Sequence, residues 1–277
     1  MRLDVSTDDS DGAEALSIRL LSSFHVVRNG EPVDDGLGRK GRQLLKILSA
    51  NRWKRLPKDL LTEMMWPESD PEAATISLKV AAHNLRNALE PDKESREPGR
   101  WVIADNGTYR LNPDADIRID VERFRAHRDQ GRASLAAGAD TTARLEFEKA
   151  EELYVGDYLE EDTYEDWTIV RREELRDLYL DTLGRLASLA LAEDIHSDVI
   201  GYCHKIILAD PCREDAYQML MRSHGALNQI ARAGSWYAVC RSALQRQIGT
   251  LPNAETVSAF EELFADREEV SSDLRTA

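Results

Sequence analysis

One stretch of the sequence places polar side chains at the spacing of a helix face. At intervals of four, four and three residues stand Thr75, Lys79, His83 and Arg86. A helix would align these side chains in one row. Asn84 and Asn87 flank the row, and Ser77 and Asn84 are included as candidate contacts. Basic and amide side chains can hydrogen-bond base edges in the major groove of DNA, and Lys and Arg can neutralise phosphates. An ordinary solvated helix face has a similar composition, so other segments must decide between the two interpretations.

Catalytic chemistry has little support among the other reactive residues. Cys203 and His204 are adjacent, and neighbouring helix residues point about 100° apart, so the two do not converge on one ligand. A hydrolase that used Cys203 would need an activated base, and none is apparent. The acidic run Glu160, Glu161 and Asp162 could suggest a metal site, but acidic turns are usually solvated. Phosphate-binding glycine loops, zinc-protease motifs and serine-hydrolase motifs are absent, so we expect no enzyme activity, no cofactor and no metal.

Charge is distributed unevenly along the 277 residues. The net charge of −15 divides into −4 for residues 1–15, +3 for 16–112 and −14 for 113–277. The total alone would argue against nucleic-acid binding, but a basic segment beside a strongly acidic one indicates two domains with different partners. Residues 1–15 and 268–277 are predicted to be disordered tails. No signal sequence, membrane-length apolar run or cysteine framework is apparent, so a cytoplasmic protein is expected.

Three helices are expected within 16–112, after one or two strands in 16–28 and a short strand near Pro32. Apolar spacing predicts these helices at 39–51, 57–66 and 71–89. The apolar face of the second is expected to hold Leu60, Leu61, Met64 and Met65. The third helix has Asp70 as its predicted cap, followed by Pro71. Its predicted buried stripe comprises Ala74, Leu78, Ala81, Ala82, Leu85 and Leu89.

A hairpin is predicted at 101–111, because Asn106-Gly107 is typical of a two-residue turn between strands. One face of the hairpin is expected to hold Trp101, Ile103, Tyr109 and Leu111. Thr108 and Arg110 are then left near the exposed side. Strands, three helices with a polar-faced third, and a hairpin that carries an Arg indicate a winged helix.

Beyond residue 113 no strand pattern is apparent, and the chain is expected to be helical. Apolar periodicity predicts helices at 119–138, 141–156, 167–192, 195–210, 213–229, 231–249 and 254–264. An offset of 37 residues aligns Cys203 with Cys240 and Ile207 with Leu244, which suggests tetratricopeptide-like helix pairs. A plain helical bundle is the alternative.

Motifs in both parts of the chain resemble one known family. Segment 16–112 resembles an OmpR-type winged helix in its Trp66, its Leu85-Arg86 and its wing sequence Gly107-Thr108-Tyr109-Arg110-Leu111. Segments 153–187 and 208–229 resemble the bacterial transcriptional activator domain, with a Leu-Tyr-x-Gly-Asp turn and an Asp-Pro-x-Arg-Glu-x-Ala helix start. This combination resembles the Streptomyces antibiotic regulatory proteins. The resemblance implies an α+β winged-helix domain at 16–112, followed by an all-α tetratricopeptide-like activator domain at 113–267.

The resemblance also implies a function and partners. Members of this family bind direct repeats near promoters as two tandem protomers and recruit RNA polymerase, including the C-terminal region of the sigma factor. The expected role is a nucleoid-associated transcriptional activator of a secondary-metabolite, antibiotic gene cluster. Ile76 stands where the family commonly has a polar residue, and Asn84 stands where related helices often have Arg. These two departures affect the target sequence rather than the binding mode.

The expected docking follows from these assignments. Helix 71–89 would enter the major groove, and Thr108 and Arg110 would lie at the minor groove or the DNA backbone. Phosphate contacts are expected from four residues at and after the first helix, which are Arg39, Lys40, Lys54 and Arg55. The competing interpretation is a protein-interaction scaffold whose winged helix docks proteins, which would not require the polar row or Arg110.

Overall fold

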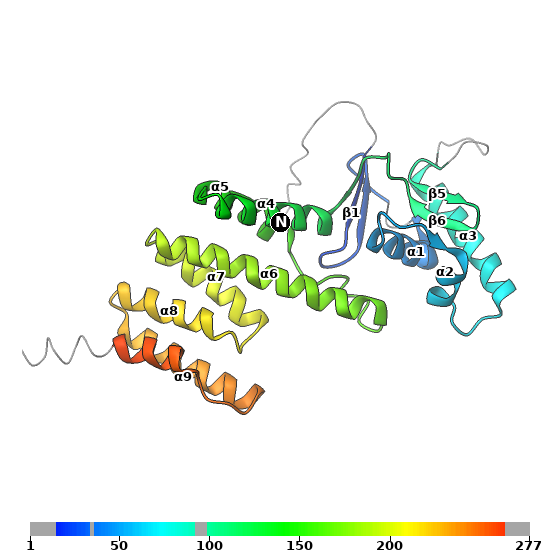
Figure 1. The fold of residues 1–277 in the computed structure, drawn as a ribbon. Helices are drawn as coiled ribbons and strands as arrows, with labels where there is room; N and C mark the ends of the chain where they lie inside the picture. Colours follow the sequence, from blue (N-terminus) through cyan, green and yellow to red (C-terminus); the bar gives the residue numbers. More distant parts are fainter. Residues whose placement is uncertain (1–14, 34–35, 92–98, 264–277) are drawn as a thin grey trace, which may run out of the picture. The chain divides into compact units, whose positions relative to one another are not determined.

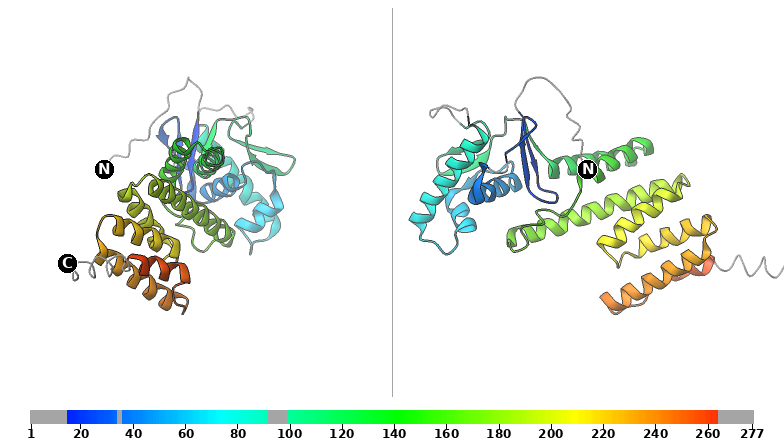
Figure 2. Two further views of the ribbon diagram at one scale, coloured as in Figure 1. Left: turned by 60° about the vertical axis from the view of Figure 1, so that its left-hand side comes forward. Right: turned by 180° about the vertical axis from the view of Figure 1, so that it is seen from behind.

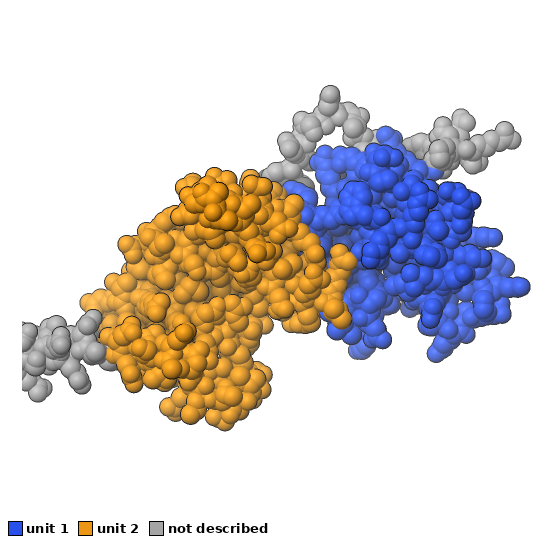
Figure 3. Space-filling view, viewed as in Figure 1, with its two compact units in different colours: residues 1–123, 155–169 blue, residues 124–154, 170–277 orange. Residues whose placement is uncertain are grey.

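The computed structural model describes residues 15–33, 36–91 and 99–263, and it divides the chain into two compact units (Figure 3). Unit 1 comprises residues 1–123 and 155–169, and unit 2 comprises 124–154 and 170–277. This division differs from the predicted boundary after residue 112, because 113–123 and 155–169 pack with the N-terminal elements. The predicted tails lie outside the described residues, apart from Ala15.

A four-stranded sheet in the order β3-β2-β1-β7 forms part of unit 1 (Figure 1). The antiparallel strands β1 (Leu16–Arg19), β2 (His25–Arg28) and β3 (Glu31–Pro32) lie where the sequence predicts strands. β7 (Ile117–Ile119) pairs parallel with β1, so the expectation of no strand beyond 113 is wrong. Three residues are too few to establish an alternating pattern, and the partner strand is distant in sequence.

Three helices and a small sheet complete the winged helix. The helices are α1 (Gly38–Ala50), α2 (Lys58–Met65) and α3 (Pro71–Leu89). The predicted buried stripe of α3 is confirmed, since each of its six residues is at most 4% exposed. The sheet has the order β4-β6-β5, built from β4 (Leu56–Pro57), β6 (Thr108–Leu111) and β5 (Val102–Asp105).

The predicted apolar face of α2 is partly wrong. Leu61 and Met65, four residues apart, are buried, whereas Leu60 is 43% exposed. A helix of only eight residues presents one narrow stripe to the core, and Leu60 lies beside that stripe. Pro57 belongs to β4, and α2 begins one residue later than predicted.

The predicted faces of the hairpin also need one correction. Ile103 pairs with Arg110, whereas Val102 pairs with Leu111. Residues that pair across two strands share a face, so Val102 rather than Ile103 lies with the buried Leu111. Trp101 is buried as well, but it precedes the paired residues of β5.

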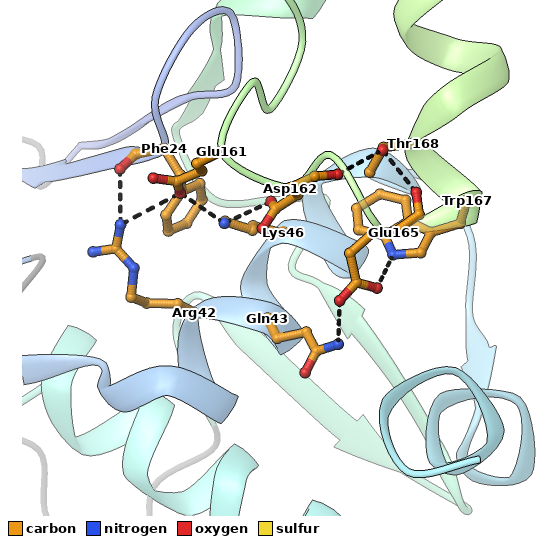
Figure 4. A network of polar contacts seen from close by, with 9 residues as sticks. All are labelled: Phe24, Arg42, Gln43, Lys46, Glu161, Asp162, Glu165, Trp167 and Thr168. Carbon is orange, nitrogen blue, oxygen red and sulfur yellow. Dashed lines mark hydrogen bonds and ion pairs between the residues drawn. The ribbon is translucent and has the colours of Figure 1, made fainter.

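Residues 155–169 return to unit 1 and contribute an acidic loop (Figure 4). Lys46 of α1 is 6% exposed, and its ammonium donates to Glu161 Oε1 at 2.8 Å and Asp162 Oδ2 at 2.6 Å. Gln43 donates to Glu165 Oε1 at 3.4 Å, and Leu159 N–H donates to the carbonyl of Leu20 at 2.8 Å. The interpretation of 160–162 as a solvated acidic turn is therefore incomplete, because Asp162 is half-buried and Glu161, although exposed, pairs with the same ammonium.

The buried carboxylate of Asp120 links the end of β1 to the start of helix α4 (Asp120–Ala136). Asp120 is 9% exposed and accepts hydrogen bonds from the N–H groups of Leu20, Leu21 and Val121 at 2.8–2.9 Å. Desolvation raises the pKa of Asp120 to about 6, and it outweighs the opposing effect of these hydrogen bonds and of Arg19.

This raised pKa predicts a pH-dependent stability. The folded state binds the proton of Asp120 more tightly than the unfolded state does, so this contribution is fully present below pH 3.8 and is lost as the pH rises through about 6. Between pH 7 and pH 5 we expect wild-type protein to gain about 1 kcal/mol more stability than Asp120→Asn. Urea unfolding at both pH values measures this difference. Asp114→Asn, at an exposed carboxylate, should keep the wild-type dependence, and equal pH dependence in wild type and Asp120→Asn would contradict the assignment.

Unit 2 is built from helices that lie side by side in succession (Figure 2). They are α4 (Asp120–Ala136), α5 (Asp140–Leu153), α6 (Asp166–Ala192), α7 (His196–Ala209), α8 (Glu214–Ala226), α9 (Ile230–Gln247) and a helical segment over 254–263. The first residues of α4 and α6 belong to unit 1. One core cluster joins α6, α7 and α8 through residues such as Leu183, Cys203 and Leu220. Among the described residues no helix is long and apolar enough to cross a membrane.

The same type of turn joins the two helices within each of the pairs α4–α5, α6–α7 and α8–α9. Its first residue has a positive φ of 73° at Gly138, 57° at Asp194 and 55° at Asn228. The N–H of the following residue donates to the carbonyl five residues earlier, in the pairs Ala139 to Ser134, Ile195 to Ala190 and Gln229 to His224. The last two turns are 34 residues apart, so the turns give a repeat of 34 rather than 37 residues. The two offsets differ by about one helical turn, which preserves the apolar stripe and explains why 37 also aligned buried residues.

Candidate nucleic-acid interface

The first turn of α3 is fixed by the residues that the sequence indicated. Asp70 Oδ2 accepts hydrogen bonds from the N–H groups of Glu72 at 3.0 Å and Ala73 at 3.1 Å. Pro71 follows at the first helical position, where an N–H would have no helical partner. The predicted cap is confirmed, and it fixes where α3 begins.

The outer face of α3 carries most of the predicted polar row. Lys79, His83 and Asn84 are exposed, whereas Thr75 and Ser77 are half-exposed. The Thr75 hydroxyl donates to the carbonyl of Pro71 at 2.9 Å, and His83 Nε2 lies 3.0 Å from Asn87 Nδ2. These side chains are therefore accessible to a ligand from the solvent.

Arg86 has a structural role within unit 1. Its Nε donates to the carbonyl of Val102 at 3.1 Å, which joins the last turns of α3 to strand β5. Sequence spacing placed Arg86 in the same row as Lys79, but its half-buried guanidinium holds the wing against the helix instead of extending into solvent.

Two exposed apolar residues accompany the polar row. Ile76 is 63% exposed and Val80 is 53% exposed, and at four residues apart they form one small patch on α3. Apolar side chains at such positions can contact the methyl group of thymine. Ile76 is among the residues singled out in the sequence and Val80 is not, although the spacing of the two could have revealed the pair.

The wing has the geometry expected of a tight hairpin. Asn106 and Gly107 have φ values of 48° and 73°, as a two-residue turn of this kind requires. The Thr108 hydroxyl donates to the carbonyl of Asp105 at 2.8 Å. Arg110 is half-exposed and lies on the face opposite to buried Leu111, so the predicted orientation of Arg110 agrees with the register.

A small cleft of about 180 Å³ lies between α3 and the wing. Thr75 and Lys79 line it from α3, Thr108 lines it from the wing, and Lys58 lines it from the start of α2. The N–H of Lys58 donates to the carbonyl of Gly107 at 2.9 Å, which fixes α2 to the wing tip. Lys58 is not among the contacts predicted from the sequence. A cation in the first turn opposes the helix dipole, so its position suggests a role other than helix stability.

The four predicted phosphate contacts differ in their surroundings. Arg39, Lys54 and Arg55 are exposed, and Arg55 Nη1 lies 3.9 Å from Asp105 Oδ2 near the wing. Lys40 instead donates to the carbonyl of Met65 at 2.6 Å and to Gln43 at 2.9 Å, and lies over the ring of Trp66. Burial and the charge of Arg39 lower the pKa of Lys40, against a smaller opposing effect of Glu165. Lys40 therefore joins α1 to α2 within unit 1.

Catalytic and metal chemistry finds no support among the described residues. No group of three or more His, Cys, Asp or Glu there could hold a metal ion. Cys203 is fully buried, and desolvation, assisted by the charge of Asp215, raises the pKa of its thiol to about 12. A buried, protonated thiol disfavours the alternative of a hydrolase that uses Cys203.

Fold and surface together define a class of protein. An α+β winged helix with a solvent-facing third helix is followed in the chain by an all-α unit of tetratricopeptide-like helix pairs. This is the architecture of a winged-helix transcription regulator with a helical-repeat domain.

Comparisons with known proteins then place the chain in a family. Residues 119–264 match the family model of the bacterial transcriptional activator domain. Regulatory protein AfsR of Streptomyces coelicolor is 24% identical over 244 residues, which cover 88% of this chain and 24% of AfsR. The solved structure of Mycobacterium tuberculosis EmbR, in complex with a low-affinity phosphopeptide, shares the fold with a TM-score of 0.76 and 23% identity, over 91% of this chain and 66% of that chain. The chain belongs to the bacterial transcriptional activator domain family, and the predicted membership of the Streptomyces antibiotic regulatory proteins is confirmed.

Proposed function

We propose that this chain is a sequence-specific DNA-binding transcriptional activator. In this proposal α3 enters the major groove and presents Lys79, His83 and Asn84 to base edges. The wing lies along the adjacent minor groove or backbone, with Arg110 as its main contact. The cleft between α3 and the wing is the observation that carries the proposal, because it gathers Lys58, Thr75, Lys79 and Thr108 at one surface.

Phosphate contacts would surround this central region. Lys58 and Lys79 belong to different helices but line the same cleft, so together they can hold one stretch of DNA backbone. Arg55, Lys54 and Arg39 add exposed positive charge. The net charge of +3 over residues 16–112 favours modest non-specific affinity, which would make tandem binding of two protomers useful.

The remaining parts of the proposal rest on the family. Direct repeats near promoters, two protomers in tandem, and RNA polymerase with the C-terminal region of its sigma factor are the proposed partners. A secondary-metabolite, antibiotic gene cluster is the proposed target. The strongly acidic segment 113–277 would steer the chain toward a basic surface of the transcription machinery.

Single substitutions should separate positioning contacts from sequence-reading contacts. Arg110→Ala should weaken binding roughly tenfold for a bound site and for a scrambled duplex alike, because a backbone contact carries no sequence information. Lys79→Ala and His83→Ala should instead change the ratio between the two duplexes. Genome-wide mapping of bound DNA supplies the site, and fluorescence-anisotropy titrations measure the affinities.

Further variants sharpen this test. Lys58→Ala should reduce the slope of log affinity against log salt by about one if Lys58 neutralises one phosphate. Arg241→Ala, at an exposed Arg of α9, controls for loss of charge alone and should bind like wild type. If Arg110, Lys79 and His83 can all be truncated without effect, the docking geometry is wrong. If no DNA segment is enriched, the protein-docking scaffold becomes the better description.

A further inference from the structure

A large cavity in unit 2 is not explained by DNA binding. It has a volume of about 860 Å³ and lies between α7 and α9, beside the C-terminal end of α8. This volume falls within the range of sites for small organic ligands, which in helical proteins often lie between helices. The turns that begin at Asp194 and Asn228, described above as repeats of one motif, border it through Asp194 and Gln229.

One wall of the cavity is apolar and includes an aromatic ring. The indole of Trp236 lies between two other rings, with centroids 5.1 Å from His204 and 6.3 Å from Tyr217. Leu227 and Val239 also line the cavity, and they are 44% and 43% exposed. Apolar side chains left in solvent beside a fixed ring provide a surface on which a flat apolar molecule can be buried.

The polar side of the cavity is formed mainly by nitrogen-bearing side chains. Three imidazoles, those of His196, His204 and His224, line it together with the guanidinium of Arg232. Asp194 is the one carboxylate among the described lining residues. The predominance of nitrogen-bearing side chains over carboxylates contrasts with the net charge of −14 for residues 113–277. The cavity therefore interrupts an otherwise acidic part of the chain.

The position of His224 is unusual within the repeat. Its carbonyl accepts the turn hydrogen bond that Ser134 and Ala190 accept in the two preceding turns. Those positions carry small side chains, whereas the third turn places a buried imidazole there, 2% exposed. Its Nδ1 lies 2.8 Å from Gln229 Oε1, within hydrogen-bond distance. The imidazole is thus held in one orientation at the edge of the cavity.

We propose that this cavity binds a small organic anion with a flat apolar body. The body would lie against Trp236, Leu227 and Val239, and the carboxylate would lie among Arg232 and the imidazoles. Arg232 is exposed and can swing to pair with a carboxylate, and the charge-assisted hydrogen bonds supply specificity. This proposal is independent of the DNA-binding function, since all of these residues belong to unit 2.

Isothermal titration calorimetry of the full chain with 2-naphthoate tests the proposal, with 2-naphthamide as the uncharged analogue. We expect the carboxylate to bind about tenfold more tightly than the amide, because the amide loses the charged hydrogen bonds. Arg232→Gln should weaken naphthoate binding by a similar factor, and His204→Gln should weaken it as well.

The matched control is Arg241→Gln, which removes an exposed Arg from the same helix outside the cavity and should leave the affinity unchanged. Thermal unfolding of each variant checks that the fold is retained, and both Arg side chains are exposed, so no loss is expected. The proposal is overturned if naphthoate does not bind at millimolar concentration, if the amide binds equally well, or if Arg232→Gln and Arg241→Gln behave alike.

Discussion

The double variant Glu161→Gln/Asp162→Asn should lower the free energy of unfolding by about 3 kcal/mol, because it leaves the buried charge of Lys46 without a carboxylate partner. The side chain of Lys46 is 8% exposed, whereas those of Asp162 and Glu161 are 21% and 41% exposed. The ammonium also lies 5.2 Å from the ring centre of Phe24, which cannot replace two carboxylates. Urea unfolding of wild type and variant measures the difference.

Two further variants show whether the effect depends on the buried cation. Lys46→Met should cost less than the acidic double variant, because an apolar side chain fits the buried position and the carboxylates left behind are partly solvated. Glu160→Gln, in the same acidic run, should change stability by less than about 0.5 kcal/mol, since the Glu160 carboxylate accepts an exposed hydrogen bond from the Ser22 hydroxyl. Equal stability of wild type and the double variant would show that the loop does not depend on Lys46.

The second large effect is expected at Trp101, where Trp101→Ala should destabilise unit 1 by about 3–5 kcal/mol. Trp101 is 1% exposed, and its backbone N–H donates to Glu90 Oε1 at 3.0 Å, just after the last turn of α3. Loss of the ring would leave a cavity where β5 begins. Trp101 leads directly into β5, the strand that Arg86 holds through Val102, so loss of the ring should also loosen the wing and lower the proposed DNA affinity.

The indole nitrogen of Trp101 supplies an internal control for this prediction. Nε1 is buried without a hydrogen-bond partner in the described structure, so Trp101→Phe removes an unsatisfied donor along with part of the ring. Trp101→Phe should therefore retain most of the stability that Trp101→Ala loses. Trp53→Ala, at a residue 71% exposed, should have little effect. Denaturant unfolding of the three variants gives the ranking, and a similar loss for Phe and Ala would contradict it.

Local sequence patterns were sufficient to predict helix α3. The cap at Asp70, the proline after it and the apolar spacing from Ala74 to Leu89 act within one segment, so the buried stripe and the exposed face follow from the sequence. The turn at Asn106-Gly107 is equally local. These features also set the outward orientation of Lys79 and His83.

Other features depend on partners that are distant in the sequence. β7 becomes a strand because β1 is available to pair with it, and Asp162 is paired because Lys46 lies buried in a helix more than a hundred residues earlier. Arg86 and Lys40 look like free cations in the sequence, yet nearby backbone carbonyls bind both. Lys58 joins the cleft because β4 brings the start of α2 to the wing tip. Spacing along one segment carries no information about such contacts.

The return of residues 155–169 to unit 1 has a consequence for synthesis of the chain. Translation releases the N-terminal strands first, but the backbone partner of Leu20 and the carboxylates that neutralise Lys46 emerge only with Leu159, Glu161 and Asp162. At roughly 5–20 residues per second, the delay after residue 112 is on the order of several seconds. During that time the ammonium of Lys46, which is buried in the complete chain, has no carboxylate partner. The nascent winged helix therefore cannot reach its final stability. A ribosome-bound chain that stops before residue 155 should therefore be a substrate for chaperones, whereas one that exposes residue 169 should not.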